Sequence, residues 1–205
     1  MFVKICGITR VTDALAAAEC GASAIGFNFY PHSTRCVAPD VAAEISRALP
    51  LGVLRVGLFV NATAEDINTL DERLHFDLIQ LHGDETPEFC AQWGERVIRA
   101  LRIGGEDDLK QIDDYGSVRH IMIDASVPGA YGGTGVTCDW ELAAKAVTCS
   151  EQPVILAGGL TPENVSEAIR RVRPQGVDVA GGVESAPGVK DHDKIRAFVD
   201  AARSV

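Results

Sequence analysis

The sequence predicts an α/β fold, a compact parallel eight-stranded (βα)8 barrel with short loops, from three observations. Short β-branched apolar runs alternate with amphipathic, Ala- and Leu-rich stretches, which is typical of a parallel sheet covered by helices. Eight such pairs can be traced along the chain. The 205 residues therefore allow about 26 residues for each unit, slightly fewer than the roughly 250-residue barrel provides.

The expected strands are short apolar runs, and each is followed by one expected helix. The strands cover residues 2–6, 24–29, 54–60, 78–82, 97–101, 120–124, 153–157 and 177–179. The helices are expected to begin near Val11, Pro39, Ala64, Pro87, Asp107, Asp139, Pro162 and Asp191. Thr-Pro-Glu at 86–88 and at 161–163 supplies a capping hydroxyl, a first-turn proline and an acid for the helix dipole.

Residues 1–205 are expected to form a single domain, because no linker composition interrupts this alternation. The alternative is an open doubly wound sheet. That fold usually has a GxGxxG turn after its first strand, and Cys6-Gly7-Ile8-Thr9 does not match it.

Composition and charge restrict the class of protein. The chain is 46% hydrophobic and 23% charged, with a net charge of -10, so we expect no nucleic-acid partner. No apolar run reaches the roughly 18 residues of a membrane span. The six cysteines are scattered without metal-ligand spacing, so we expect reduced thiols, no metal site and a cytoplasmic location. Either a monomer or a homodimer is compatible with the sequence.

Two connections depart from the compact pattern. Residues 126–137 form a long Gly-rich segment after the sixth strand, of the kind that covers a site. Residues 30–37 follow the second strand and contain Arg35, which should therefore face the C-terminal end of the barrel, where barrel enzymes place their active sites.

Cys6 and Asp124 are the candidates for proton transfer. Lys4 and Cys6 alternate onto the same face of the first strand, so the Lys4 ammonium should favour the Cys6 thiolate. Asp124 ends the sixth strand at the same rim and is a candidate general acid. The alternatives are that Cys6 is a small buried apolar residue and that Asp124 caps the following loop.

Glycine pairs after the last two strands predict an anion site. Gly158-Gly159 and Gly181-Gly182 free backbone N–H groups where barrels commonly bind phosphate, although they can also be simple turn residues. Gly132-Gly133-Thr134-Gly135 is a weaker signal, because no Walker lysine follows it.

Three further polar residues are candidate ligand contacts. Arg35 has the geometry to clamp a carboxylate, but a solvated arginine is equally compatible with its position. His82 is either a structural histidine or a contact to ligand or lid. Asp178 lies within an apolar strand and should pair with Lys4, another donor or a substrate hydroxyl. The remaining histidines are expected at the surface: His32, His75, His120 and His192.

Eight segments, taken in order along nearly the whole chain, resemble the phosphoribosylanthranilate isomerase family. The resembling segments are residues 4–9, 24–27, 29–31 with Ser33 and Arg35, 56–61, 80–85, 132–135 with Asp139-Trp140, 156–160, and 176–179 with 182–184. One departure is Ala180-Gly181, where small serines are common in the family, so backbone N–H groups should replace a hydroxyl.

The resemblance implies a (βα)8 TIM barrel and an Amadori rearrangement of N-(5'-phosphoribosyl)anthranilate without cofactor or metal. It implies that Asp124 is the general acid that opens the ribose ring and that Cys6 is the general base that removes the C2' proton. Lys4, Arg35, His82 and Asp178 would bind the anionic substrate, with Arg35 on its carboxylate. The two glycine pairs would bind its phosphate.

Other functions are compatible with a barrel. Another phosphosugar isomerase or epimerase would keep the phosphate glycines but would not need Lys4, Cys6, Arg35 and Asp124 together. A non-catalytic ligand-binding barrel would need no acid and base at its rim. A hydrolase with a Cys6 nucleophile would need an activating histidine, which the sequence does not place.

Overall fold

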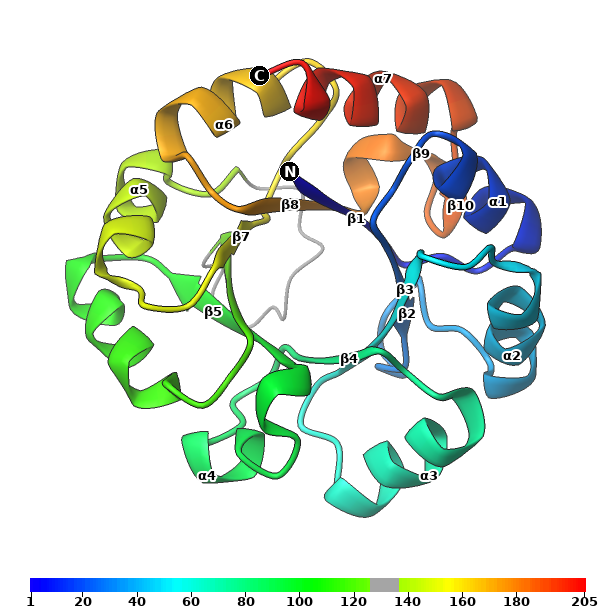
Figure 1. Cartoon of the computed structure of the whole chain (residues 1–205), viewed down its shortest axis with the longest axis horizontal. Coiled ribbons are helices and arrows are strands. Elements are labelled where there is room, and N and C mark those ends of the chain that lie inside the picture. The colour runs from blue at the N-terminus through cyan, green and yellow to red at the C-terminus, as the bar shows by residue number, and fades with distance from the viewer. Residues whose placement is uncertain (126–136) are drawn as a thin grey trace.

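The chain forms a closed eight-stranded parallel barrel in the computed structural model, which describes residues 1–125 and 137–205. Strands follow one another around the barrel in chain order, and helical segments form the outer ring (Figure 1). The (βα)8 TIM-barrel prediction is therefore confirmed. The expected covering segment, 126–137, and the weaker glycine motif, 132–135, lie outside the described residues except for Thr137.

All eight expected strands are present, with ends that differ by at most two residues. The strands are β1 (Phe2–Cys6), β2 (Ala24–Asn28), β3 (Leu54–Phe59), β4 (Leu78–Leu81), β5 (Val97–Ile103), β6 (His120–Ala125), β7 (Val154–Leu156) and β8 (Gly176–Val179). Register between β1 and β8 pairs Lys4 with Asp178 where the first and last strands meet.

The outer ring contains seven α-helices within the described residues. They are α1 (Val11–Glu19), α2 (Pro39–Ala48), α3 (Ala64–Leu74), α4 (Pro87–Cys90), α5 (Trp140–Cys149), α6 (Val165–Val172) and α7 (His192–Arg203). The expected starts of α1, α2, α3 and α4 are confirmed, and Asp139 and Asp191 cap α5 and α7 with their side chains. No described helix combines the length and apolar character of a bilayer span.

Two of the expected helices differ from the prediction. The segment after β5 is a 3-10 helix, η2 (Glu106–Tyr115), whose buried Ile112 and Tyr115 are three residues apart, as that helix requires. Helix α6 begins at Val165 rather than Pro162. Asn164 explains the delay, because its side chain accepts from the Thr161 amide and donates to the Gly159 carbonyl, which holds the preceding residues in a turn.

Further short elements were not predicted. A 3-10 turn, η1 (Gly94–Arg96), precedes β5. After β8 come η3 (Gly181–Val183) and the antiparallel pair β9 (Glu184–Ala186) and β10 (Val189–Lys190). This hairpin brings Glu184 and Lys190 back toward the mouth of the barrel.

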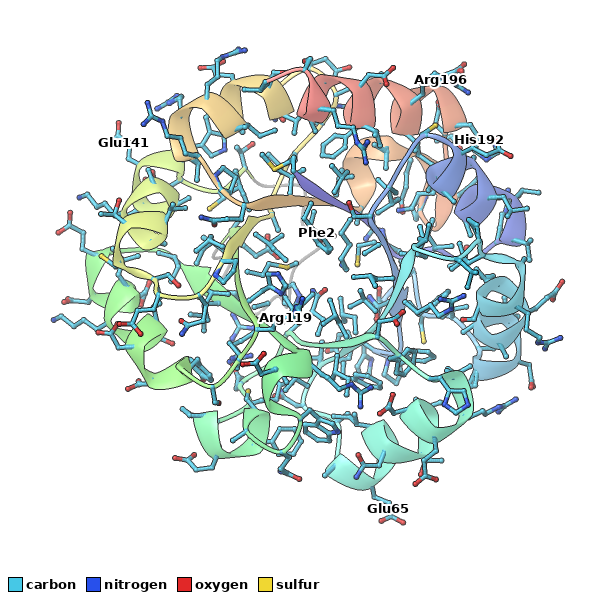
Figure 2. All side chains as sticks on the ribbon, viewed as in Figure 1. Phe2, Glu65, Arg119, Glu141, His192 and Arg196 are labelled. Atoms are coloured by element: carbon cyan, nitrogen blue, oxygen red, sulfur yellow. The ribbon has the colours of Figure 1, made fainter. Side chains whose placement is uncertain are left out.

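The core has two layers. Buried apolar side chains between the sheet and the helices form the larger layer. A smaller cluster fills the barrel interior with Ala24, Val56, Leu78, Ile98, Ala100, Met122, Ile155 and Ala157. Phe2 also lies inside the ring of strands, whereas Glu65, Glu141 and Arg196 project outward from the helices (Figure 2). The polar residues above this apolar plug are therefore confined to one end of the barrel.

Candidate active site

The candidate site residues project into the C-terminal end of the barrel from four strands. In β1, Phe2 belongs to the interior cluster, so alternation also points Lys4 and Cys6 inward. In β4 and β6 the same reasoning extends from Leu78 and Met122 to the polar residues that follow them. These inward polar residues are Lys4, Cys6, Gln80, His82, Asp124 and Asp178, each buried or nearly so.

Lys4 and Asp178 form a buried ion pair. Lys4 Nζ lies 2.8 Å from Asp178 Oδ1, and Lys4 is fully shielded from solvent. Burial lowers the pKa of Lys4, but the Asp178 carboxylate and Cys6 outweigh burial and raise that pKa above its ordinary value. Of the partners expected for Asp178, which were Lys4, another donor or a substrate hydroxyl, the structure shows Lys4, and Lys4 is held as the ammonium ion.

Cys6 lies beside this ion pair. A Cβ on Gly26, its register partner in β2, would lie 2.9 Å from Cys6 Sγ and 3.0 Å from Lys4 Nζ. Gly26 therefore makes room for both groups. Burial raises the pKa of the Cys6 thiol, and although Lys4 lowers it, the net shift is upward. The expectation that Lys4 favours the thiolate is right in direction, but it is wrong for the net balance because burial is the larger effect.

Asp124 is held by His82 and by the amide of the next residue in β6. Asp124 Oδ2 lies 3.1 Å from His82 Nε2, and Asp124 Oδ1 accepts from the Ala125 amide at 2.8 Å. Gln80 Nε2 lies 2.9 Å from the other ring nitrogen, His82 Nδ1. Asp124 thus ends a buried chain of three polar side chains, and the alternative that it caps the following loop falls on residues outside the described part of the chain.

Arg35 is engaged by a carboxylate of the chain itself. Its Nε and Nη2 each donate to Glu184 at 2.8 Å, and Lys190 Nζ donates to Glu184 Oε1 at 2.9 Å. Burial raises the pKa of Glu184, but the bonds from Arg35 and Lys190 outweigh burial and lower it. The alternative of a solvated arginine is therefore wrong for this structure, because Arg35 holds Glu184 in a bidentate manner. The expected contact of Arg35 with a ligand carboxylate stays a prediction.

The two glycine pairs lie in loops that pack against each other. Gly158 and Gly159 have φ values of +82° and +64°, in the left-handed region that favours glycine. A Cβ on Gly182 would lie 1.9 Å from the Leu160 carbonyl oxygen, and one on Gly181 would lie 3.1 Å from Arg35 Nη2. The loops after β7 and β8 therefore meet at close range, with the Arg35 guanidinium next to them.

Sequence reasoning missed four residues of this arrangement. Gly26 and Gln80 occur in motifs but were given no role, and only the register and the alternation within β4 indicate that they face inward. Glu184 and Lys190 reach the site through a hairpin that no strand signal predicted. Among residues 1–125 and 137–205, no cluster of three or more His, Cys, Asp or Glu side chains is arranged to hold a metal ion.

Of the histidines expected at the surface, His120 is partly buried, whereas His192 is exposed as expected and also makes a specific contact. The His120 ring stacks on Phe2 with centroids 5.8 Å apart at the start of the barrel, and burial lowers the pKa of His120. His192 Nε2 lies 2.9 Å from the buried carboxylate of Asp13, which also accepts from the Lys190 amide. His32 and His75 are exposed as expected.

Comparison with known proteins gives one consistent family. The profile of the N-(5'phosphoribosyl)anthranilate (PRA) isomerase family matches residues 3–201. An N-(5'-phosphoribosyl)anthranilate isomerase from Geotalea daltonii is 52% identical over 201 residues, which cover 98% of this chain and 96% of the relative.

Solved structures agree with that result. Phosphoribosyl anthranilate isomerase from Thermotoga maritima superposes with a TM-score of 0.92 at 42% identity, and all of both chains is covered. A phosphoribosyl anthranilate isomerase in complex with reduced 1-(o-carboxyphenylamino)-1-deoxyribulose 5-phosphate has a TM-score of 0.88 at 40% identity, again over both whole chains. The chain therefore belongs to the N-(5'-phosphoribosyl)anthranilate isomerase family.

Proposed function

We propose that Asp124 and Cys6 are the acid and base of the family reaction in this protein. That reaction converts N-(5'-phosphoribosyl)anthranilate to 1-(2-carboxyphenylamino)-1-deoxyribulose 5-phosphate, a step of tryptophan biosynthesis. One observation supports the assignment most strongly. A carboxyl group and a thiol, from β6 and β1, both face into the mouth of one barrel, and each has fixed neighbours.

Asp124 acts first in this proposal. Its carboxyl group donates a proton to the ribose ring oxygen, the bond from that oxygen to C1' breaks, and the nitrogen lone pair forms a C1'–nitrogen double bond. The ring oxygen becomes a hydroxyl, and Asp124 becomes a carboxylate. The Ala125 amide and His82, which already contact the two Asp124 oxygens, then stabilise that negative charge.

Cys6 acts second. Its thiolate removes the C2' proton, and the electrons of that bond form the C1'–C2' double bond while the iminium nitrogen is neutralised. The resulting enolamine tautomerises to the ketone, so the product is an isomer of the substrate. Burial raises the pKa of the Cys6 thiol and so disfavours the thiolate. The ammonium of Lys4 and the positive iminium beside C2' both favour its formation.

The remaining site residues bind and orient the substrate in this proposal. Arg35 exchanges Glu184 for the anthranilate carboxylate, since both present the same two-oxygen acceptor to the guanidinium. Asp178 contacts a ribose hydroxyl, and Lys4 supports Cys6. His82, whose two ring nitrogens contact Gln80 and Asp124, contributes to the substrate site by orienting Asp124. The backbone N–H groups around Gly158-Gly159 and Gly181-Gly182 bind the phosphate, with the positive Arg35 close to Gly181.

The proposal includes a location and an assembly state. All six cysteines are free thiols, which fits the reducing cytoplasm. Both a monomer and a homodimer are compatible with the site described above. Light scattering of the purified protein decides between these two states.

The second candidate is another phosphosugar isomerase or epimerase, which would also use the two glycine pairs. The bidentate carboxylate site at Arg35 favours an anthranilate substrate over a simple sugar phosphate, because a sugar phosphate has no carboxylate to replace Glu184.

The test supplies phosphoribosylanthranilate made in situ from anthranilate and phosphoribosyl pyrophosphate and follows its loss by fluorescence. Wild type is expected to consume it, and Cys6→Ala and Asp124→Asn are expected to lose most of the rate while staying folded. If wild type is inert, the assignment is wrong. If one variant remains active, the role given to that residue is wrong.

A further inference from the structure

Gln80 is a fully buried amide beneath the catalytic carboxyl, and no role has been given to it so far. Its Nε2 lies 2.9 Å from His82 Nδ1 and 3.4 Å from Met122 Sδ. Its Oε1 is buried and has no hydrogen-bond partner in the described part of the chain. A buried amide carbonyl normally has a donor, so this orientation leaves half of the Gln80 amide unsatisfied.

The Gln80 orientation fixes where the His82 proton is. An amide NH2 group only donates, so His82 Nδ1 must accept, and the single ring proton is on Nε2. His82 Nε2 then donates to Asp124 Oδ2, while Asp124 Oδ1 accepts from the Ala125 amide. Both Asp124 oxygens thus accept hydrogen bonds in this arrangement, which suits the carboxylate that the acid step leaves behind.

The acid step needs one more proton on the His82–Asp124 pair. Before substrate binds, this proton can be stored between the two residues in two ways. If it is on Asp124 Oδ2, the acid O–H donates to His82 Nε2 and the ring proton moves to Nδ1; if it is on His82, both ring nitrogens become donors. In both arrangements His82 Nδ1 carries a hydrogen and needs an acceptor, so the NH2 group of Gln80 can no longer face it. The carbonyl oxygen of Gln80 is an acceptor, so it can face His82 Nδ1 instead.

We propose that Gln80 is a positioning residue whose amide orientation is coupled to the loading of the catalytic proton. Its NH2 group faces His82 when the His82–Asp124 pair has given its proton away, and its Oε1 faces His82 when the pair is loaded. A half-turn about the last side-chain bond exchanges two atoms of similar size, so the surrounding core need not repack. The proposal rests on the acid role of Asp124 proposed above.

The contacts of the Gln80 amide in its two orientations are compatible with such an exchange. In the unloaded orientation the carbonyl is unsatisfied, and one of the amide contacts is to a thioether sulfur, a weak acceptor. In the loaded orientation the carbonyl gains the His82 Nδ1–H donor, and the NH2 group gives up its two present contacts. Neither orientation satisfies the whole amide, which leaves the proton count of the pair to decide between them.

Other ionisable groups face the pair from the surrounding elements. Arg102 on β5 is the register partner of Asp124. Cys138, in the segment before α5, stays a thiol, because burial first, then Asp124 and Asp139, raise its pKa to about 12. The groups across the barrel mouth are Lys4, Cys6, Asp178 and, behind them, Lys190. The experiment below therefore follows His82 and Gln80 directly rather than inferring their states from activity alone.

The experiment is a nitrogen-15 NMR pH titration of the substrate-free enzyme, with the His82 ring signals assigned by loss in His82→Asn. We expect His82 Nδ1 to change from unprotonated to protonated as pH falls. The Gln80 side-chain amide signals should change with the same midpoint, and that midpoint should match the alkaline limb of the kcat profile. If the Gln80 signals stay constant while His82 titrates, the proposal is wrong.

A variant gives an independent test of the same coupling. An ionised Gln80→Glu side chain can only accept, so it should hold the proton on His82 Nδ1 and move the alkaline limb of kcat to higher pH, with little change in KM. Met122→Leu is the matched control, since it alters the other neighbour of Gln80 and should leave the limb in place. The proposal would be overturned if Gln80→Glu left both the alkaline limb of the kcat profile and the His82 Nδ1 signal where they are in wild type. If wild type does not turn over the substrate at all, the proposed function fails, yet the substrate-free titration still tests the coupling.

Discussion

Lys4 Nζ and Asp178 Oδ1 lie 2.8 Å apart on β1 and β8, the first and last strands of the barrel. The pair is buried beside Cys6, so this contact joins the two strands whose pairing closes the barrel and also places a positive charge next to the thiol. A buried charge whose partner is removed is strongly destabilising, because it has lost water and gained nothing in return.

Asp178→Ala should therefore lower the free energy of unfolding by about 3–5 kcal/mol, because it leaves Lys4 buried and unpaired. Urea denaturation measures this loss. Asp40→Ala is the matched control, since it breaks the exposed ion pair between Asp40 and Arg73 and should cost no more than about 1 kcal/mol. Equal losses in the two variants would show that the Lys4–Asp178 pair has no special structural role.

Arg35→Lys should raise the KM for phosphoribosylanthranilate about tenfold or more with a smaller change in kcat. Lysine cannot reproduce the two parallel N–H donors that now hold Glu184 and would hold the substrate carboxylate. Steady-state kinetics with Arg73→Lys as the exposed control measures the effect. A KM equal to that of wild type would show that Arg35 does not bind the substrate carboxylate.

Gly182→Ala should also raise KM about tenfold or more, because its Cβ would lie 1.9 Å from the Leu160 carbonyl oxygen and force apart the loops after β7 and β8, which we propose bind the phosphate. Gly116→Ala is the control: a Cβ there meets nothing within 4 Å, and Gly116 has a φ of -58°. The thermal unfolding of both variants should be recorded alongside their kinetics. Unchanged KM in a folded Gly182→Ala protein would argue against a phosphate site at these loops.

Loss of the Cys90 proton should lower the free energy of unfolding at alkaline pH. Burial raises the pKa of its thiol from 9.0 to about 11, so the folded state holds this proton more tightly than the unfolded state does. The resulting stability is fully present below pH 9 and is lost as pH rises toward 11. Between pH 8 and pH 10 the expected loss is about 1.4 kcal/mol.

Cys90→Ala removes this titration, so its free energy of unfolding should fall by about 1.4 kcal/mol less than that of wild type over the same pH interval. Urea denaturation at both pH values gives the comparison, and Cys138 remains in both proteins as a common background. Parallel pH dependences in the two proteins would contradict the expectation.

Much of the fold could be predicted because its signals are local. Each strand is a short apolar run, and strand alternation alone places Lys4, Cys6 and Asp124 inside the barrel at one end. The need to pair a buried acid predicted that Asp178 has a partner and placed Lys4, far away in sequence, among the candidates, and the structure shows that Lys4 is the partner.

The remaining features depend on contacts that no local pattern encodes. Arg35 meets Glu184 only because a hairpin after β8 folds back over the barrel mouth. The delayed start of α6 depends on which atoms the Asn164 side chain reaches, and the Thr-Pro-Glu signal does not contain that information. The net pKa shift of Cys6 is set by how deeply the folded chain buries it, which composition cannot give.

The order of the two proton transfers is the central claim, and trapping the intermediate tests it most directly. Cys6→Ala, Asp124→Asn and the double variant are each mixed with phosphoribosylanthranilate and cyanoborohydride, and mass spectrometry measures the reduced open-chain amine. We predict accumulation in Cys6→Ala alone, because Asp124 still opens the ring while nothing removes the C2' proton. Trapping in Asp124→Asn but not in Cys6→Ala, or normal turnover by Cys6→Ala, would contradict the assignment of Asp124 as acid and Cys6 as base.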